Sequence, residues 1–146
     1  MENHMKITIS ALSENEAFAR SAVAAFCIPL KPTVDEINEI KTAVSEAVTN
    51  AIVHAYRGGE GEIILTAWYD TSGVLHMEII DQGKGIPSVE EAMQPFFTTG
   101  AEEERSGMGF TIMRSFTDGL EVLSTPGEGT VVRMQKRIGT AAGDVK

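Results

Sequence analysis

Two pairs of β-rich segments, each joined by a short turn, constrain the fold of this chain most strongly. Residues 62–69 and 74–81 form the first pair, and residues 120–125 and 130–136 form the second. Glycine-containing turns separate the members of each pair, a pattern that predicts two antiparallel hairpins. Residues 6–10 alternate polar and apolar side chains and predict one further strand.

Helix-opening signals precede and separate these hairpins. Ser13-Glu14-Asn15-Glu16 matches a capping box, with Leu12 placed to pack on Ala17, and predicts a helix that runs to about Phe26. Thr33-Val34-Asp35-Glu36 is a second capping box and predicts the longest helix of the chain.

The middle of the chain carries weaker signals. The long helix is expected to end at Arg57-Gly58-Gly59, and a short helix is predicted from Ser88. Residues 96–105 lack periodicity and predict a mobile loop, followed by a helix at residues 109–116.

Helices and hairpins in this order predict an α+β fold, a two-layer sandwich in which helices cover one face of a mostly antiparallel sheet. The chain has 146 residues, which suits one domain with one core. We expect this domain to span residues 1–138, with residues 139–146 as a frayed tail.

The composition excludes several classes of protein. A net charge of −9 disfavours direct binding to nucleic acid. The chain has no apolar stretch long enough to cross a membrane, and its first six residues do not form a secretory signal. The single cysteine, Cys27, predicts a buried structural thiol in a reducing compartment. We therefore expect a cytoplasmic protein.

The long helix carries the first candidate site. Glu46, Asn50 and His54 recur every four residues and predict one polar stripe in an otherwise uncharged segment. A solvated helix face is the alternative interpretation. In a cleft, however, the Glu46 carboxylate can accept a proton, and the Asn50 carboxamide oxygen can bind Mg²⁺. His54 is interpreted as a secondary residue of this site.

Two glycine-rich segments supply the second and third candidates. In Asp81-Gln82-Gly83-Lys84-Gly85-Ile86, a strand ends in an Asp that can accept a hydrogen bond from the amine of adenine. In Arg105-Ser106-Gly107-Met108-Gly109-Phe110, glycines precede a helix and can expose N–H donors to phosphate. An ordinary turn and a plain loop-to-helix joint are the alternatives.

Taken in order, the three segments resemble the motifs of the GHKL ATPase and kinase superfamily, which includes gyrase, Hsp90, histidine kinases and MutL. Residues 46–51 are similar to its N box, residues 81–86 to its G1 box and residues 106–110 to its G2 box. The resemblance covers residues 33–136 and implies a Bergerat-type α/β sandwich that binds ATP between the long helix and a flexible lid.

The resemblance also implies a role for each matching residue. Asn50 would hold Mg²⁺, Asp81 would bind the adenine amino group, and Thr130 would help to fix the base. Gly83 and Gly85 would shape the adenine pocket.

At the phosphate end, the resemblance implies that the backbone of the third segment cradles the phosphates. The residues concerned are Ser106, Gly107, Met108 and Gly109. Arg105 would reach the γ-phosphate.

Glu46 indicates the branch of the superfamily. Histidine kinases usually carry Asn at this position, whereas a carboxylate suits activation of water or of a Ser/Thr hydroxyl. A short chain without further domains resembles the stand-alone anti-sigma factor serine kinases of sporulating bacilli. That resemblance implies a homodimer built near the N-terminal strand and helix, which binds a sigma factor. It also implies an anti-anti-sigma protein as substrate and Mg-ATP as phosphoryl donor, with ADP as product.

Two other functions stay open on the sequence alone. The chain could be the excised catalytic domain of a histidine kinase, although Glu46 argues against it. It could also be a binding module that holds ATP without phosphoryl transfer, since nucleotide binding does not need Glu46.

Overall fold

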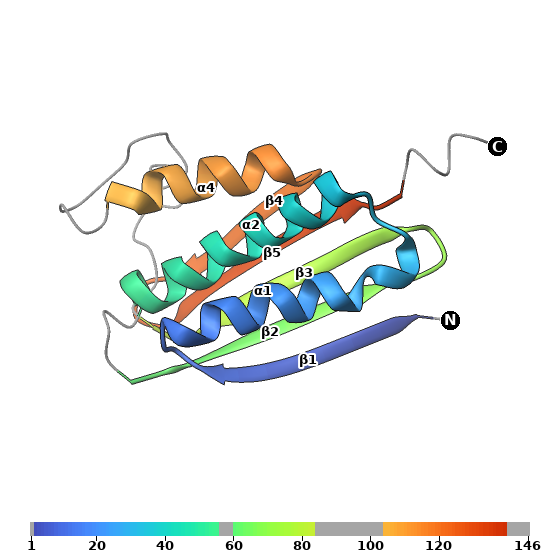
Figure 1. The fold of residues 1–146 in the computed structure, drawn as a ribbon. Coiled ribbons are helices and arrows are strands. Elements are labelled where there is room, and N and C mark those ends of the chain that lie inside the picture. Colours follow the sequence, from blue (N-terminus) through green and yellow to red (C-terminus); the bar gives the residue numbers. More distant parts are fainter. Residues whose placement is uncertain (1, 56–59, 84–103, 140–146) are drawn as a thin grey trace.

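A computed structural model describes residues 2–55, 60–83 and 104–139, without the side chains at 54–55 and 104–108. Within these ranges an antiparallel sheet of five strands lies under three helices (Figure 1). The strands are β1 (Asn3–Ser10), β2 (Glu62–Tyr69), β3 (Val74–Asp81), β4 (Gly119–Thr125) and β5 (Gly129–Arg137). The helices are α1 (Glu14–Phe26), α2 (Val34–Asn50) and α4 (Glu104–Phe116), with a 3₁₀ turn at Ile28–Leu30 and a π-helical turn at Ala51–Ala55.

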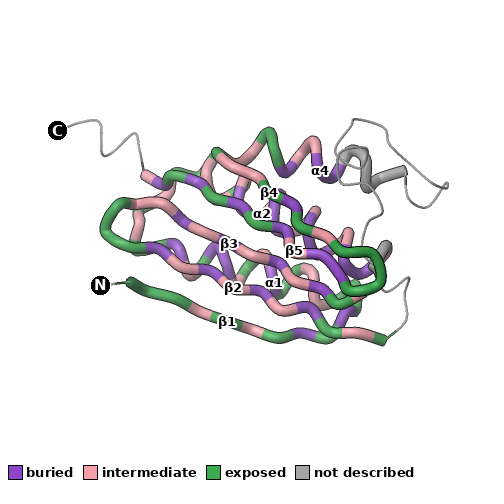
Figure 2. The backbone as a smooth tube through the Cα atoms, turned by 180° about the vertical axis from the view of Figure 1, so that it is seen from behind, coloured by how far each residue is buried: buried purple, intermediate pink, exposed green. Residues whose placement is uncertain are grey.

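The sheet has the strand order β1-β2-β3-β5-β4. Both predicted hairpins are confirmed, as β2–β3 and β4–β5. The last strand, β5, lies between its hairpin partner β4 and strand β3 of the other hairpin. Its register with β3 pairs Asp81 with Thr130. The helices cover one face of this sheet, as Figures 1 and 2 show from opposite sides, so the predicted α+β sandwich is also confirmed.

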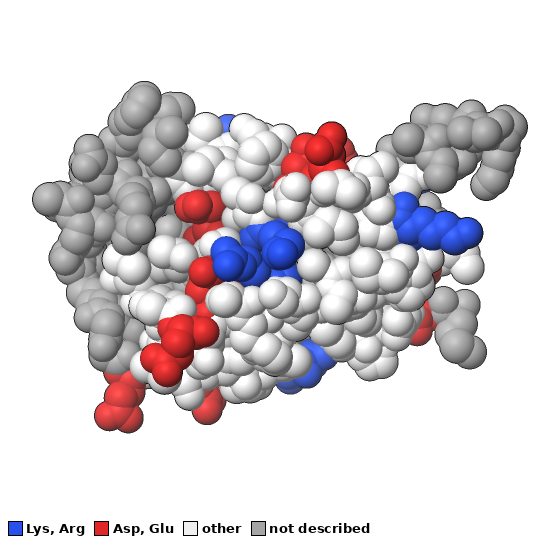
Figure 3. Space-filling view, in the orientation of Figure 1, with Lys and Arg blue, Asp and Glu red and all other residues white. Residues whose placement is uncertain are grey.

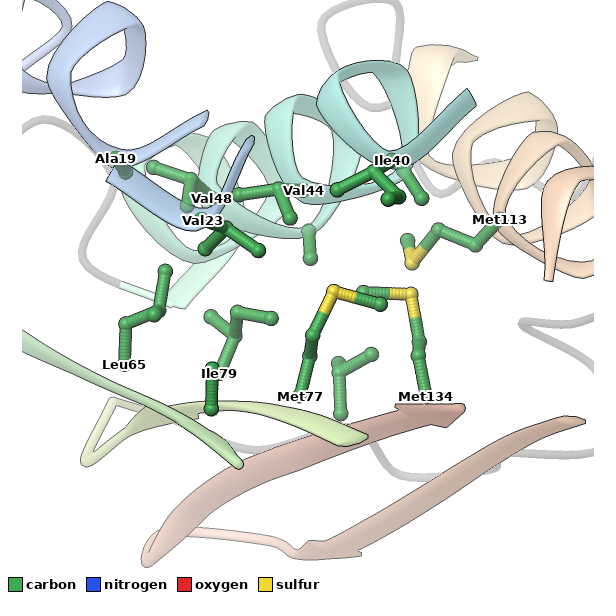
Figure 4. Packing of buried hydrophobic residues seen from close by; sticks show 14 of the residues in the cluster. Ala19, Val23, Ile40, Val44, Val48, Leu65, Met77, Ile79, Met113 and Met134 are labelled. Atoms are coloured by element: carbon green, nitrogen blue, oxygen red, sulfur yellow. The ribbon is translucent and has the colours of Figure 1, made fainter. Parts of the chain in front are cut away.

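The core fills the space between the helices and the sheet. Alternate residues of β2 and β3 are buried, because successive side chains of a strand point to opposite faces. In Figure 4 the valines of α1 and α2 point toward Leu65 and Ile79, while Met77, Met113 and Met134 meet where α4 crosses the sheet. Each of these large side chains contributes about 1.5–3 kcal/mol by burial.

The capping box that opens α2 is confirmed. The Glu36 N–H donates to Thr33 Oγ1 at 3.1 Å, and the Thr33 N–H donates to Glu36 Oε1 at 2.9 Å. Glu36 Oε1 also accepts from the Gly139 N–H at 3.0 Å, which ties the end of the described chain to the start of α2.

The capping box predicted at Ser13 is wrong, although the helix it was expected to open is present. Ser13 already has helical dihedral angles (φ −54°, ψ −35°) and makes no side-chain cap hydrogen bond. A capping side chain needs an extended residue to reach the N–H groups of the first turn. Leu12, which was predicted to pack on Ala17, is 49% exposed, and Ala17 is exposed as well.

Helix α4 begins five residues before the predicted start at Gly109. Its first residue is Glu104, so the backbone from Arg105 to Gly109 is helical rather than a loop leading into a helix. A glutamate at the first position favours this start, because its charge interacts well with the positive end of the helix dipole.

The thiol of Cys27 is buried and donates to the Ala24 carbonyl oxygen at 3.3 Å. Burial raises its pKa to about 11. The prediction of a structural thiol is therefore confirmed.

Other predictions lie outside the described residues. These are the end of the long helix at Arg57-Gly58-Gly59, the helix from Ser88, the loop up to residue 103, and the tail from residue 140. None of the described helices combines the length and apolar character needed to cross a membrane.

Candidate functional site

Helix α2 supplies two polar side chains that face the first turns of α4. Glu46 and Asn50 lie one helical turn apart and are half-buried. A methyl group in place of the Gly109 hydrogen would lie 3.2 Å from Glu46 Oε1 and 3.3 Å from Asn50 Oδ1. The side chains of the first predicted motif and the backbone of the third are therefore in direct proximity.

Asn50 has a polar atom that the described protein does not satisfy. Its Nδ2 is buried and has no hydrogen-bond partner among the described residues. A buried amide group without a partner is unfavourable by about 1–3 kcal/mol, so this side chain is suited to a bound ligand.

The same side chain fits the predicted Mg²⁺. The two ends of a carboxamide are assigned by hydrogen bonding, so either end can face a ligand. No three His, Cys, Asp or Glu side chains in the described part of the chain lie close enough to hold a metal by themselves. A carboxamide oxygen that shares Mg²⁺ with phosphate oxygens and water needs no such cluster.

Asp81 lies at the end of β3 and is 8% exposed. Burial raises the pKa of its carboxyl group, while hydrogen bonds from the backbone N–H groups of Gly83 and Thr130 oppose that shift. The Gly83 N–H donates to Asp81 Oδ1 at 3.0 Å. The carboxylate is thus held in a fixed orientation in a poorly hydrated place, where it can accept a hydrogen bond from a ligand.

Thr130 lies opposite Asp81 across β3 and β5 and is also buried. Its hydroxyl oxygen is 2.9 Å from that of Ser124, the residue opposite it on β4. Asp81, Thr130 and Ser124 line one hollow of about 610 Å³ at this end of the sheet.

Gly129 allows the strands to approach closely beside this hollow. Its φ is +119°, and a methyl group there would collide with the backbone of Asp81 and Gln82. Only glycine adopts this conformation without strain.

The structure brings the predicted residues together in two groups. Glu46, Asn50 and Gly109 form one group, and Asp81, Gly83 and Thr130 form the other. The π-helical turn that follows Asn50 contacts β3, which ends in Asp81, so the elements that carry the two groups are in contact. Local π-helical turns are frequent at functional sites.

Several predicted site residues cannot be placed in these groups. Gly85 lies outside the described residues, as does the side chain of His54 within the π-helical turn. The backbone of α4 places a further set in its first two turns, but their side chains are not described. This set is Arg105, Ser106, Gly107 and Met108.

Ser124 and Gly129 were not predicted from the sequence. The signal that could have identified them is the register of the second hairpin. Pairing Thr125 with Gly129 places Ser124 directly opposite Thr130.

Comparison with known proteins identifies the family. The family of the histidine kinase-like ATPase domain matches residues 9–136, which is most of the chain. The chain belongs to this histidine kinase-like ATPase family.

Within the family, the chain is similar to several anti-sigma F factors. It is 57% identical to that of Caldanaerobacter subterraneus over 94% of this chain and 95% of the relative. It is 53% identical to that of Geobacillus kaustophilus over 94% of each chain.

Solved structures of histidine kinase-like ATPases share the fold. The RsbU and RsbW domains of Rv1364c from Mycobacterium tuberculosis match with a TM-score of 0.67 and 18% identity, over 93% of this chain and 32% of that one. The catalytic domain of the histidine kinase ThkA matches with a TM-score of 0.56 and 17% identity, over 93% and 96%.

Proposed function

We propose that this protein is an anti-sigma factor and a protein serine kinase of the cytoplasm. It binds a sporulation sigma factor and phosphorylates a serine of an anti-anti-sigma protein with Mg-ATP. The observation that carries the kinase assignment is the position of Glu46 beside Asn50, with both side chains facing Gly109. The names of the relatives, anti-sigma F factors, support the sigma-factor assignment.

Each group of the site has a part in this reaction. Asp81 and Thr130 bind the adenine, with Gly83 and Gly85 shaping its pocket. The first turns of α4 bind the phosphates through the backbone of residues 106–109, with Arg105 close to the γ-phosphate and His54 supporting the site. Asn50 is the protein ligand of Mg²⁺, which when bound offsets the negative charge of the phosphates.

Glu46 provides the general base. The serine oxygen of the partner attacks the γ-phosphorus, the bond to the bridging oxygen of ADP breaks, and the serine proton passes to the Glu46 carboxylate. Binding of the nucleotide itself does not require that carboxylate, which makes the assignment testable.

The test is incubation with γ-labelled ATP, Mg²⁺ and a purified anti-anti-sigma protein. Glu46→Gln is expected to lose transfer by a factor of about 10² or more. Its affinity for Mg-ADP, measured by calorimetry, should change little. Asp35→Asn, an exposed carboxylate-to-amide change in the first turn of the same helix, should behave as the wild type.

The form of the label separates the alternatives. Acid-stable label on a partner serine supports the kinase. Acid-labile label would support a histidine kinase catalytic domain instead. Bound nucleotide without any transfer would favour a binding module that regulates by contact alone.

The sigma-factor assignment has its own measurement. Titration of the protein with a purified sigma subunit in the presence of ATP is expected to give a complex. Failure to form one would overturn this half of the proposal and leave the kinase half unaffected.

A homodimer is part of the same proposal. Strand β1 lies at the edge of the sheet, and its N–H and C=O groups on the outer side have no neighbouring strand within the described chain. Edge strands of this kind readily pair with another chain. Sedimentation equilibrium should give twice the monomer mass of 15.7 kDa.

The surface agrees with a protein partner better than with nucleic acid. On the face that carries the helices, the described acidic and basic side chains are scattered among uncharged ones, without a continuous basic stretch (Figure 3). Nucleic-acid binding depends on clustered positive charge that neutralises phosphates.

A further inference from the structure

The hydroxyl groups of Ser124 and Thr130 form a hydrogen-bonded pair. Ser124 Oγ lies 3.1 Å from the Gly129 carbonyl oxygen and 2.9 Å from Thr130 Oγ1. A carbonyl oxygen can only accept, so a bond between Ser124 and Gly129 uses the one hydroxyl proton of Ser124. The distance between the two hydroxyl groups allows either one to be the donor, and in the arrangement where Ser124 donates to Gly129 the bond is donated by Thr130.

That arrangement fixes what Thr130 offers to a ligand. With its proton engaged by Ser124, the Thr130 hydroxyl presents only a lone pair to the hollow that both residues line. Asp81, paired with Thr130 across the two strands, presents a carboxylate to the same hollow. Residues directly opposite on adjacent antiparallel strands have Cβ atoms about 5 Å apart, so these two acceptors lie side by side.

We infer that Ser124 is a specificity-determining residue of the nucleotide site. By accepting the Thr130 proton, it keeps that hydroxyl as an acceptor beside Asp81. The base edge that fits is then one with two donor hydrogens, such as the 6-amino group of a purine. A purine with an oxygen at position 6 places its lone pairs against both acceptors and is rejected. This inference rests on the nucleotide binding proposed above and adds the residue that sets base selectivity.

The size of the effect follows from what Ser124 controls. Without its hydroxyl, the Thr130 proton is released, and the threonine can rotate to donate to an oxygen at position 6. Asp81 remains an acceptor in either case. Removal of Ser124 should therefore reduce the selectivity for the amine without abolishing it, and a single hydrogen bond corresponds to about a tenfold change.

The experiment measures binding of two diphosphates by calorimetry in the presence of Mg²⁺. One is ADP, and the other is 6-methoxypurine riboside 5′-diphosphate, which carries an oxygen at position 6 and, like adenine, no hydrogen on N1. The measured quantity is the ratio of the two dissociation constants. Ser124→Ala is expected to narrow this ratio about tenfold, and Ser124→Thr, which retains a hydroxyl group, to restore it.

Two further variants identify the cause. In Thr130→Val no hydroxyl is left to orient, so adding Ser124→Ala to it should not change the ratio further. Ser115→Ala removes an exposed hydroxyl that donates to the Thr111 carbonyl on α4 and should leave the ratio at the wild-type value.

The outcomes separate this inference from the proposed function. If both diphosphates bind and the ratio is unchanged in Ser124→Ala, the role of Ser124 is overturned while nucleotide binding stands. If neither diphosphate binds to the wild-type protein, both proposals fail. The readout is the ratio of two dissociation constants measured on the same variant. A loss of stability that weakens the binding of both diphosphates equally therefore does not change this ratio.

Discussion

At the scale of single residues, Gly109 shows how closely α4 approaches the polar side chains of α2. Replacing Gly109 by alanine adds a methyl group 3.2–3.4 Å from Glu46 and Asn50, which must then move by a few tenths of an ångström. Alanine favours a helix by about 1 kcal/mol over glycine, so the unfolding free energy should fall little or even rise. The affinity for Mg-ADP should fall about tenfold, because the methyl group occupies space next to the proposed phosphate site.

Urea unfolding and calorimetry on the same preparation test this separation. A loss of stability with unchanged affinity would show that the glycine has a packing role only.

The second residue-scale prediction concerns Asp81. Because burial raises its pKa above the ordinary value of 3.8, the carboxyl group stabilises the fold below that pH, and this contribution is lost as pH rises through the raised value. Asp81→Asn removes the buried charge and should therefore raise the unfolding free energy at pH 7. The same variant should lose nucleotide affinity, because one of two acceptor positions becomes a donor.

Unfolding measured at pH 5 and pH 8 provides the control. The stability gained by Asp81→Asn should be larger at pH 8 than at pH 5, because the contribution of the wild-type carboxyl group is lost as pH rises through its raised pKa. A variant less stable than the wild type at both values would contradict the argument.

At the scale of elements, Lys136 fixes one end of the pair formed by α2 and α4. Its Nζ lies 2.8 Å from Glu39 Oε1 on α2 and donates to the carbonyl oxygen of Phe116, the last residue of α4, at 3.0 Å. Glu39 precedes Glu46 by seven residues, and Phe116 follows Gly109 by seven. The two helices run antiparallel (Figure 1), so Lys136 holds the end opposite to the candidate site.

Lys136→Met keeps the buried stem of the side chain and removes its charge. We expect a loss of about 1–2 kcal/mol in unfolding free energy, because the Phe116 carbonyl loses its donor and Glu39 loses a partner that is only 11% exposed. Hydrogen exchange should quicken in α4 more than in the other described elements. Arg137→Met, an exposed change at the next residue, should cost less than about 0.5 kcal/mol; equal losses in the two variants would contradict a specific role for Lys136.

The elements also show why sequence reasoning succeeded in some places and failed in others. The hairpins were predictable because glycine-containing turns act locally. The strand order was not, since neither the sequence of β4 nor that of β5 states which strand pairs with β3. The boxes at Ser13 and Thr33 have the same spacing, yet only Thr33 caps its helix. At Ser13 the chain turns directly out of β1, with the Leu12 N–H bonded to the Ser10 carbonyl, and enters the helix already in helical conformation.

In the candidate site, too, the features set by local sequence were predictable and those set by contacts between distant segments were not. Glu46 and Asn50 were predicted from helical spacing, and Asp81 from its place at a strand end. The contact of Gly109 with α2 and the pairing of Ser124 with Thr130 depend on how distant segments are brought together. No local pattern encodes that arrangement.

At the scale of the whole molecule, β1 has a neighbouring strand on one side only, β2, within the part of the chain that the structure describes. If β1 forms the proposed dimer contact, its amide hydrogens should exchange more slowly as protein concentration rises through the dimer dissociation constant. The inner strands β2, β3 and β5 should not respond. Hydrogen exchange at concentrations above and below that constant tests this, and rates in β1 that are independent of concentration would exclude the strand as the contact.

Helix α4 belongs at once to the core and to the candidate site. Gly109 faces Glu46, and one turn later Met113 is buried against the methionines of β3 and β5 (Figure 4). We therefore expect a change of side-chain volume at Met77 or Met134 to alter the distance between Gly109 and α2. Substitutions in the hydrophobic core and changes in nucleotide affinity are usually treated as separate, but here the first should affect the second. In a library selected only for folding, substitutions at these three methionines should yield proteins of equal stability whose nucleotide affinities nevertheless differ.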